Sequence, residues 1–190
     1  VFDPQAFAAA RNWCQRDDGQ PLVVEIGFQL GEFAADYCAL HPDHAYLGFE
    51  VRKQFCEESA RLLRERGVAN ARLCLADART ILAEVAADGR VDELFVFFPD
   101  PWWKPRHVKK RLFSEDFVAD AHGWLKPGGR LLLKTDVQQY AALAQNVLTA
   151  HGGFRVECLA DPHAELPWTL RERRCALHGH PTWAVAAWRQ

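Results

Sequence analysis

Short apolar runs alternate with segments of helical period along most of this 190-residue chain. The runs are rich in β-branched and aromatic residues and cover residues 22–26, 45–49, 71–75, 93–98 and 130–134. The segments between them place apolar residues three and four positions apart, most clearly over 51–67 and 136–151. Strands that alternate with helices favour a doubly wound α/β fold, in which helices cover both faces of a mostly parallel sheet.

Two later runs, at 154–158 and 182–188, predict two final strands. The expected sheet therefore has seven strands and closes on a hairpin. No internal repeat or Gly/Ser-rich linker divides the chain. We expect a single domain over residues 1–190, with a helical segment at 1–20 and an irregular loop at 160–180.

Charge is unevenly distributed along the chain. The 23 Lys and Arg residues and the 25 Asp and Glu residues give a net charge of −2. Residues 104–111 contribute five basic side chains and no acid, which leaves the rest of the chain at −7. A basic block on a mildly acidic body favours one directed surface for a polyanion, although a solvated helix face has the same composition.

Composition excludes several other classes of protein. No apolar run approaches the roughly 20 residues of a membrane-spanning helix, and residues 1–20 carry no secretory signal. The six cysteines are widely spaced and include no Cys-x-x-Cys pair, which argues against a zinc site and for reduced thiols. We therefore expect a cytoplasmic protein with no membrane and no metal among its partners. Because the chain contains no methionine, we also expect residues before Val1.

Acidic side chains and glycines follow the first three predicted strands. Gly27 and Gly31 lie in the turn after the first strand, where glycine lets the backbone approach a ligand closely. Glu50 ends the second strand and suits the hydroxyls of a ribose, and Asp77 follows the third and suits an adenine amino group. Either acid alone is equally consistent with a helix cap. Because ligands bind at the carboxyl ends of parallel strands, the acids together predict a nucleoside site.

The nucleoside is expected to be S-adenosylmethionine rather than a dinucleotide. The turn lacks the Gly-x-Gly-x-x-Gly pattern of dinucleotide sites. Glu25, inside the first strand, is suitably placed for the ammonium group of an amino acid.

The most specific stretch of the chain is residues 97–112, which reads Phe-Phe-Pro-Asp-Pro-Trp-Trp-Lys-Pro-Arg-His-Val-Lys-Lys-Arg-Leu. It resembles the bacterial tRNA (guanine-N7)-methyltransferase family, whose hallmark is Phe-Pro-Asp-Pro-Trp followed by Lys and a basic run. The likeness continues at Lys-Pro-Gly-Gly (126–129), Thr-Asp (135–136) and Thr-Leu-Arg-Glu-Arg-Arg (169–174), and it extends from residue 22 nearly to the end. The resemblance implies a Rossmann-like class I methyltransferase fold with an antiparallel last strand.

The resemblance also implies a set of functional residues and partners. The expected cofactor is S-adenosylmethionine, the expected partner is tRNA, and the expected product is 7-methylguanosine in the tRNA variable loop. The cofactor residues are Glu25, Gly27, Gly31, Glu50, Asp77, Ala78 and Asp100, of which Asp100 is also catalytic. The substrate residues are Lys104, Asp136, Thr169 and Glu172, and the RNA-binding residues are Arg106, His107, Lys109, Lys110 and Arg111. We expect a monomer or a weak homodimer.

The chemistry is consistent with these residue types. Guanine N7 carries a lone pair and no proton, so methyl transfer from a sulfonium needs alignment rather than a general base. Positive charge then develops on the base. Carboxylates such as Asp100 or Asp136 would stabilise that charge and accept hydrogen bonds from guanine N1 and its amino group.

Three residues depart from the family's pattern. Gln29 replaces the middle glycine of the first turn, and a side chain there costs roughly 1–2 kcal/mol if φ is positive. Arg171 stands where the family commonly has an aromatic residue, and Cys175 where glycine is usual. Two alternatives therefore remain: a paralogue with another methyl acceptor, and an RNA-binding relative whose catalysis Gln29 has weakened.

Overall fold

The structure, a computed structural model, describes residues 4–16, 19–86, 89–102, 104, 106, 111–160 and 166–190. Its centre is one seven-stranded sheet in the order β3-β2-β1-β4-β5-β7-β6. The strands are β1 (Leu22–Ile26), β2 (Ala45–Glu50), β3 (Ala71–Leu75), β4 (Val91–Phe97), β5 (Leu125–Thr135), β6 (Phe154–Leu159) and β7 (Trp183–Arg189). The helices are α1 (Pro4–Cys14), α2 (Glu32–Leu40), α3 (Lys53–Glu65), α4 (Ala78–Val85), α5 (Glu115–Trp124), α6 (Gln138–His151) and α7 (Leu170–Leu177).

The sheet has the predicted number of strands and the predicted strand directions. Strands β1 to β5 pair in parallel, with β1 between β2 and β4. Only β7 is reversed, and it runs antiparallel to both of its neighbours, β5 and β6. The expected doubly wound sheet with an antiparallel last strand is therefore confirmed.

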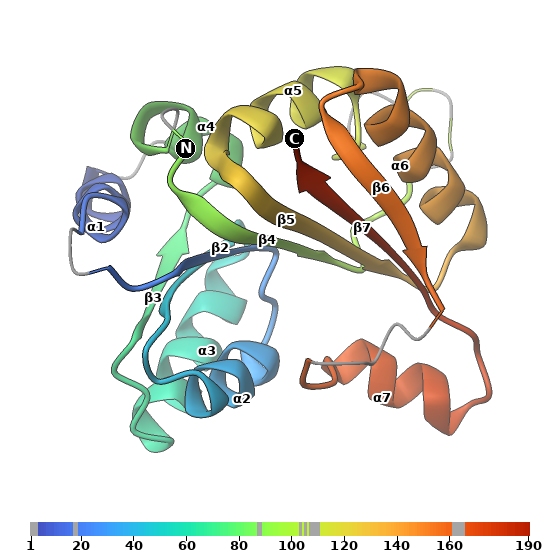
Figure 1. Cartoon of the computed structure of the whole chain (residues 1–190). Coiled ribbons are helices and arrows are strands. Elements are labelled where there is room, and N and C mark those ends of the chain that lie inside the picture. The colour runs from blue at the N-terminus through green and yellow to red at the C-terminus, as the bar shows by residue number, and fades with distance from the viewer. Residues whose placement is uncertain are drawn as a thin grey trace.

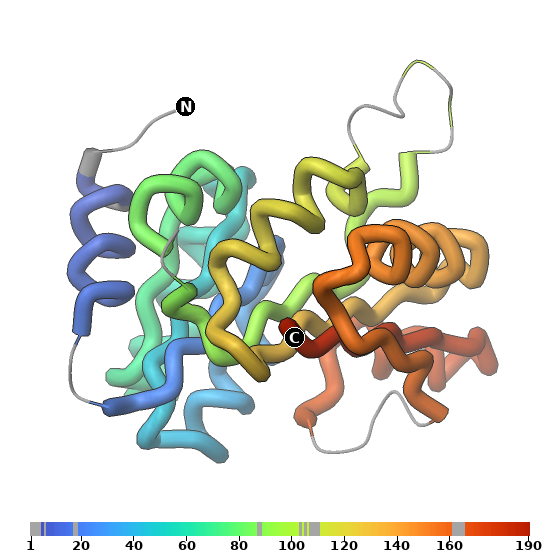
Figure 2. The backbone as a smooth tube through the Cα atoms, turned by 45° about the horizontal axis from the view of Figure 1, so that its top comes forward, coloured from blue at the N-terminus to red at the C-terminus, as the bar shows by residue number. Residues whose placement is uncertain are grey.

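Helices cover both faces of the sheet. Figure 1 shows α1, α4, α5 and α6 on one face and α2, α3 and α7 on the other. Strand residues alternate between the two layers: Leu22 and Val24 pack into the core under α1, α4, α5 and α6, and Val23 packs with α2 on the opposite face. Figure 2 shows the helices of the first layer in a row from α1 through α4 and α5 to α6.

A helix forms inside the 160–180 segment for which the sequence analysis predicted an irregular loop. The helix, α7, begins with a capping box, because the Thr169 side chain accepts from the backbone N–H of Glu172 and the Glu172 side chain accepts from that of Thr169. This exchange satisfies two donors that would otherwise be unpaired in the first turn.

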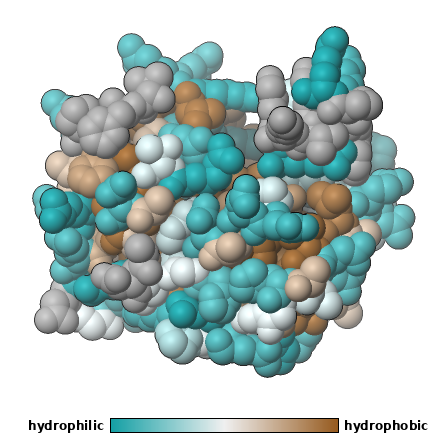
Figure 3. Space-filling model, turned by 90° about the horizontal axis from the view of Figure 1, so that it is seen from above, coloured by the Kyte–Doolittle hydropathy of each residue, from teal (hydrophilic) through white to brown (hydrophobic). Residues whose placement is uncertain are grey.

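Figure 3 shows the surface over α1, α4, α5 and α6, where hydrophilic side chains are mixed with apolar patches. In the part of the chain that the structure describes, no helix is long and apolar enough to cross a membrane. All six cysteines are free in the structure, and four of them are buried. The carboxyl ends of the parallel strands meet at one edge of the sheet, where Gly27, Glu50 and Asp77 lie together.

Candidate functional site

The turn after β1 is held in a left-handed conformation at three positions. Gly27, Gln29 and Gly31 have φ values of 84°, 50° and 75°. A Cβ on Gly31 would lie 2.8 Å from the Cβ of Ser59 in α3, so this position needs glycine for space as well as for its φ. Gln29 therefore has the positive φ at which a side chain is expected to cost roughly 1–2 kcal/mol. Its backbone strain is offset by two hydrogen bonds: its N–H donates to Glu50 Oε2 (3.2 Å), and its carbonyl accepts from Ser59 Oγ (2.9 Å).

Glu50 is oriented by three backbone N–H groups at this edge of the sheet. Its Oε1 accepts from the backbone N–H groups of Val51 (2.8 Å) and Arg52 (3.0 Å), in addition to the Gln29 N–H bound by Oε2. These donors fix the side chain at the carboxyl end of β2, where only 6% of the residue is exposed. A carboxylate fixed in this way can accept hydrogen bonds from a ligand without first having to be ordered.

Four of the predicted cofactor residues line a single cavity. Gly27, Glu50, Asp77 and Ala78 surround a volume of about 240 Å³ together with apolar atoms from the ends of the strands. Asp77 also caps α4, because its side chain accepts from the backbone N–H of Arg79 (3.0 Å). Partial burial raises the pKa of Asp77, but its hydrogen bonds with Arg79 outweigh this and leave the pKa below its usual value. Asp77 is therefore both a helix cap and part of the cavity wall.

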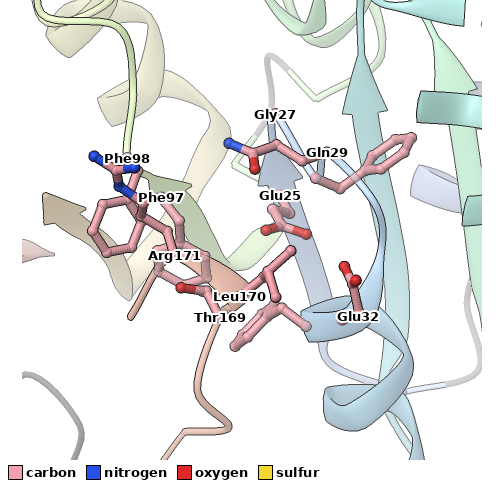
Figure 4. A pocket seen from close by; sticks show the side chains of 11 residues that line it. Glu25, Gly27, Gln29, Glu32, Phe97, Phe98, Thr169, Leu170 and Arg171 are labelled. Atoms are coloured by element: carbon pink, nitrogen blue, oxygen red, sulfur yellow. The ribbon is translucent and has the colours of Figure 1, made fainter. Parts of the chain in front are cut away.

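A second, smaller cavity contains Glu25. Its lining includes Glu25 and Gln29 from the β1 side and Phe98, Thr169 and Arg171 from the opposite side, around about 30 Å³ of space. Figure 4 shows these two groups facing one another, with the amide end of Gln29 directed across the gap. Gly27 lines both cavities, so the two adjoin.

Glu25 is a buried acid with one strong partner. It is 2% exposed, and the hydroxyl of Tyr46 donates to its Oε2. Burial raises the pKa of Glu25 to about 7; the hydrogen bond from Tyr46 lowers it and the nearby charge of Glu50 raises it. The side chain thus changes charge near neutral pH, and a cation in the cavity would favour the ionised form.

The predicted substrate residues Thr169 and Glu172 are buried at the start of α7. Besides its contact with the Thr169 N–H (2.6 Å), Glu172 accepts from Lys134 Nζ at 2.7 Å. The Lys134 and Glu172 side chains are 1% and 0% exposed. In this conformation Glu172 fixes α7 to the end of β5 rather than facing a substrate. Lys134 was not among the predicted site residues. It stands two positions after the buried Leu132 on β5, so the alternation of a strand placed it on the same inward face.

Asp100 lies in the loop after β4 and is exposed. The loop contains two residues with positive φ, Phe98 (51°) and Trp102 (42°). Arg111 Nε donates to the carbonyls of Pro101 (3.1 Å) and Trp102 (3.3 Å), so this predicted RNA-binding residue also fixes the loop that carries Asp100.

The other basic residues divide into two groups. Lys104 and Arg106 are exposed. His107, Lys109 and Lys110 lie outside the described residues, so their predicted RNA contacts remain a prediction from the sequence.

Asp136 follows β5 and is paired with Arg171 of α7. Arg171 Nε lies 3.0 Å from Asp136 Oδ2, and Nη2 donates to the same oxygen. Arg171 therefore connects a predicted substrate residue to the wall of the Glu25 cavity. Among the described residues, no cluster of three or more His, Cys, Asp or Glu side chains is suited to a metal ion.

Several solved structures with the same fold are named as methyltransferases. The 16S rRNA methyltransferase KamB superimposes with a TM-score of 0.66 at 17% identity, covering 100% of this chain and 95% of KamB. SMU.1697c, a putative methyltransferase from Streptococcus mutans in complex with SAH, superimposes with a TM-score of 0.59 at 14% identity, covering 100% of this chain and 99% of that one. The chain thus has the class I methyltransferase fold.

Comparison of sequences gives the family. The model of a family described as "Putative methyltransferase" matches residues 19–185. The tRNA (guanine-N(7)-)-methyltransferase of Ralstonia nicotianae is 39% identical over 88% of this chain and 67% of its own length. The enzyme of the same name from Chromobacterium violaceum is 38% identical over 87% of this chain and 74% of its own length. The chain belongs to the tRNA (guanine-N7)-methyltransferase family, which confirms the resemblance. It spans about two thirds to three quarters of the length of these relatives.

Proposed function

We propose that the protein transfers a methyl group from S-adenosylmethionine to N7 of a guanine in tRNA and forms 7-methylguanosine in the variable loop. The observation that carries this proposal is the pair of adjoining cavities at the carboxyl ends of the strands, in a chain of this family. One cavity has the polar groups of a nucleoside site, and the other opens from it toward α7.

The residues present fit S-adenosylmethionine. The Glu50 carboxylate, oriented by three backbone N–H groups, matches the two ribose hydroxyls, which are donors. Asp77 matches the amino group of adenine, and Glu25 matches the ammonium group of the methionine end. When bound, S-adenosylmethionine supplies a methyl group attached to a positively charged sulfur.

The acceptor needs alignment and stabilisation of charge. Because N7 has no proton, no side chain has to act as a base. Asp100, on a loop restrained by Arg111, is assigned to stabilise the positive charge that develops on the guanine ring. Asp136 is assigned to accept from N1 and the amino group of the base, which orients N7 toward the methyl group. The exposed Lys104 and Arg106 are assigned to phosphate contacts, together with His107, Lys109 and Lys110 from the same segment.

The test is to incubate the protein with S-adenosylmethionine and an unmodified tRNA transcript that has a guanine in its variable loop. Digestion to nucleosides and mass spectrometry should detect 7-methylguanosine. Absence of this nucleoside with several such transcripts would overturn the acceptor assignment. Calorimetry with S-adenosylmethionine then separates the alternatives, because a paralogue with another acceptor binds it and an RNA-binding relative does not.

Asp100 can be tested in the same assay. Asp100→Ala should abolish most methyl transfer while leaving tRNA affinity nearly unchanged, because the proposed role is stabilisation of charge in the transition state. Glu84→Ala removes an exposed acid from α4, away from the cavities, and serves as the matched control. Equal activity of Asp100→Ala and Glu84→Ala would refute the role of Asp100.

A further inference from the structure

Asp136 is engaged by a side chain of the same molecule. The Arg171 guanidinium contacts Asp136 Oδ2 through two of its nitrogens, Nε at 3.0 Å and Nη2. The Asp136 side chain is 20% exposed and that of Arg171 is 51% exposed. Because the Arg171 side of the pair is open to solvent, its loss costs little free energy, as is typical of ion pairs at the surface.

The pair lies beside the place where a methyl acceptor has to bind. Arg171 lines the Glu25 cavity together with Phe98 and Gln29. Figure 4 shows Arg171 beside Phe98, across the gap from Glu25. Arg171 and its partner Asp136 therefore lie beside the cavity assigned to the methionine end of the cofactor, and a base has to approach the methyl group from there.

The guanidinium presents the same donors as the base assigned to this site. A guanidinium offers N–H donors in one plane from a carbon bonded to three nitrogens. The N1–H and amino group of guanine form the same planar N–C–N edge. Arg171 Nε and Nη2 occupy both acceptor sites of Oδ2. A base that binds the carboxylate through both oxygens therefore has to displace at least one of these contacts.

We propose that Arg171 acts as an internal competitor of the acceptor base. Its guanidinium occupies Asp136 until the N1–H and amino edge of a guanine displaces it. This inference rests on the proposed function. Between turnovers Asp136 keeps a partner and an orientation. Acceptor binding then requires an exchange of partners, in which the guanidinium leaves and the base enters. Because N7 must stay free for methylation, the released guanidinium cannot use the N7 edge of the base and is left for a phosphate or water.

Anchorage of α7 does not depend on Arg171. The helix is also fixed by the buried pair of Lys134 and Glu172 and by its capping box. Arg173 adds a contact with Asp36 of α2, with Nη2 2.8 Å from Oδ2. Arg171 can therefore leave Asp136 while the rest of α7 stays in place.

Arg171→Gln tests the exchange. Removal of the competitor should lower the KM for tRNA about two- to fivefold, the range for an exposed ion pair, and leave kcat unchanged. The ratio of the wild-type KM to the variant KM should approach one as salt is raised, because salt screens the pair. Arg174→Gln removes the same charge from an exposed position of α7, so it controls for general attraction between this helix and tRNA.

A second variant makes the test specific to Asp136. In an Asp136→Asn background the carboxylate is gone, so Arg171→Gln should give no further gain in kcat/KM. A KM for Arg171→Gln that equals or exceeds that of the wild type, with 7-methylguanosine still formed, overturns this inference alone. A gain that persists in the Asp136→Asn background overturns it as well. Failure of the wild type to form 7-methylguanosine overturns the proposed function and this inference together.

Discussion

Replacement of Glu172 by glutamine tests how strongly the buried pair with Lys134 holds α7. Both side chains are almost completely shielded from water, and Lys134 Nζ lies 2.7 Å from Glu172 Oε1. The glutamine side chain can still accept from the N–H of Thr169, because glutamine also serves in a capping box. The substitution therefore removes the negative charge and leaves the cap in place.

The expected cost follows from the charge that is left behind. Removal of one partner of a buried ion pair typically costs about 3–5 kcal/mol, because the other charge stays buried without compensation. In a domain of this size each kcal/mol shifts Tm by about 2–4 °C, so the expected loss is roughly 6–20 °C. If α7 detaches from the sheet before the rest of the protein unfolds, the loss in global stability cannot exceed the free energy of that detachment. The α7 amides then lose their protection from hydrogen exchange.

Urea unfolding and hydrogen exchange measure the two outcomes. The double variant Lys134→Met/Glu172→Gln should recover most of the lost stability, since it removes the buried ammonium that has lost its carboxylate and fills the site with an apolar side chain of similar length. A cost below about 1 kcal/mol for Glu172→Gln, with unchanged protection of α7, would refute the view that this pair is ionised, buried and important for attachment of the helix.

Three further predictions concern the β1 side of the site. Burial raises the pKa of Glu25 from 4.5 to about 7. Between these pH values the folded state binds more protons than the unfolded state. The free energy of unfolding should therefore fall by up to about 3 kcal/mol as the pH rises through this window. Urea unfolding at several pH values should show this slope in the wild type and not in Glu25→Gln; equal slopes would exclude the shift. Gln29→Gly should stabilise the fold by up to about 1 kcal/mol, because the relief of φ strain is partly offset by the added flexibility of glycine. Calorimetry should also show tighter binding of S-adenosylmethionine, because the Gln29 side chain lines the Glu25 cavity. No change in either quantity would show that Gln29 is not a source of strain. Gly31→Ala should cost at least about 1–2 kcal/mol in thermal unfolding, because of its positive φ and the approach of a Cβ to Ser59. The control Gly123→Ala in α5, where a Cβ meets open space, should be neutral or stabilising. Similar effects of the two variants would contradict the close approach between Gly31 and Ser59.

The sequence predicted those features that depend on short-range pattern. The alternation of apolar runs with helical segments is local, so the strands and their parallel arrangement could be predicted without knowledge of the strand order. Glu50 and Asp77 were placed together because parallel strands end at one edge of the sheet, and both line one cavity.

The features that were missed depend on contacts between distant residues. Lys134 and Glu172 are 38 positions apart, and nothing in either segment alone shows that the two charges are buried against each other. The pairing of Arg171 with Asp136 is hidden in the same way, because it requires α7 to pack at the end of β5. The start of α7 itself had a local signal, since Thr169 followed by Glu172 three positions later is the capping-box pattern. An irregular loop was predicted there because the helix is short and follows a stretch without clear periodicity.

The place of β7 in the sheet determines the order in which the protein can be completed during synthesis. β7 lies between β5 and β6, although it is made after both of them. A chain emerging from the ribosome folds from its N-terminal side, so β6 has no neighbouring strand until β7 arrives, and its open edge can pair with other chains. The cavity of Glu50 and Asp77 belongs to segments made early, whereas the wall formed by α7 comes from the segment between β6 and β7. A nascent chain therefore acquires the nucleoside side of the site first and the α7 side only as the sheet closes.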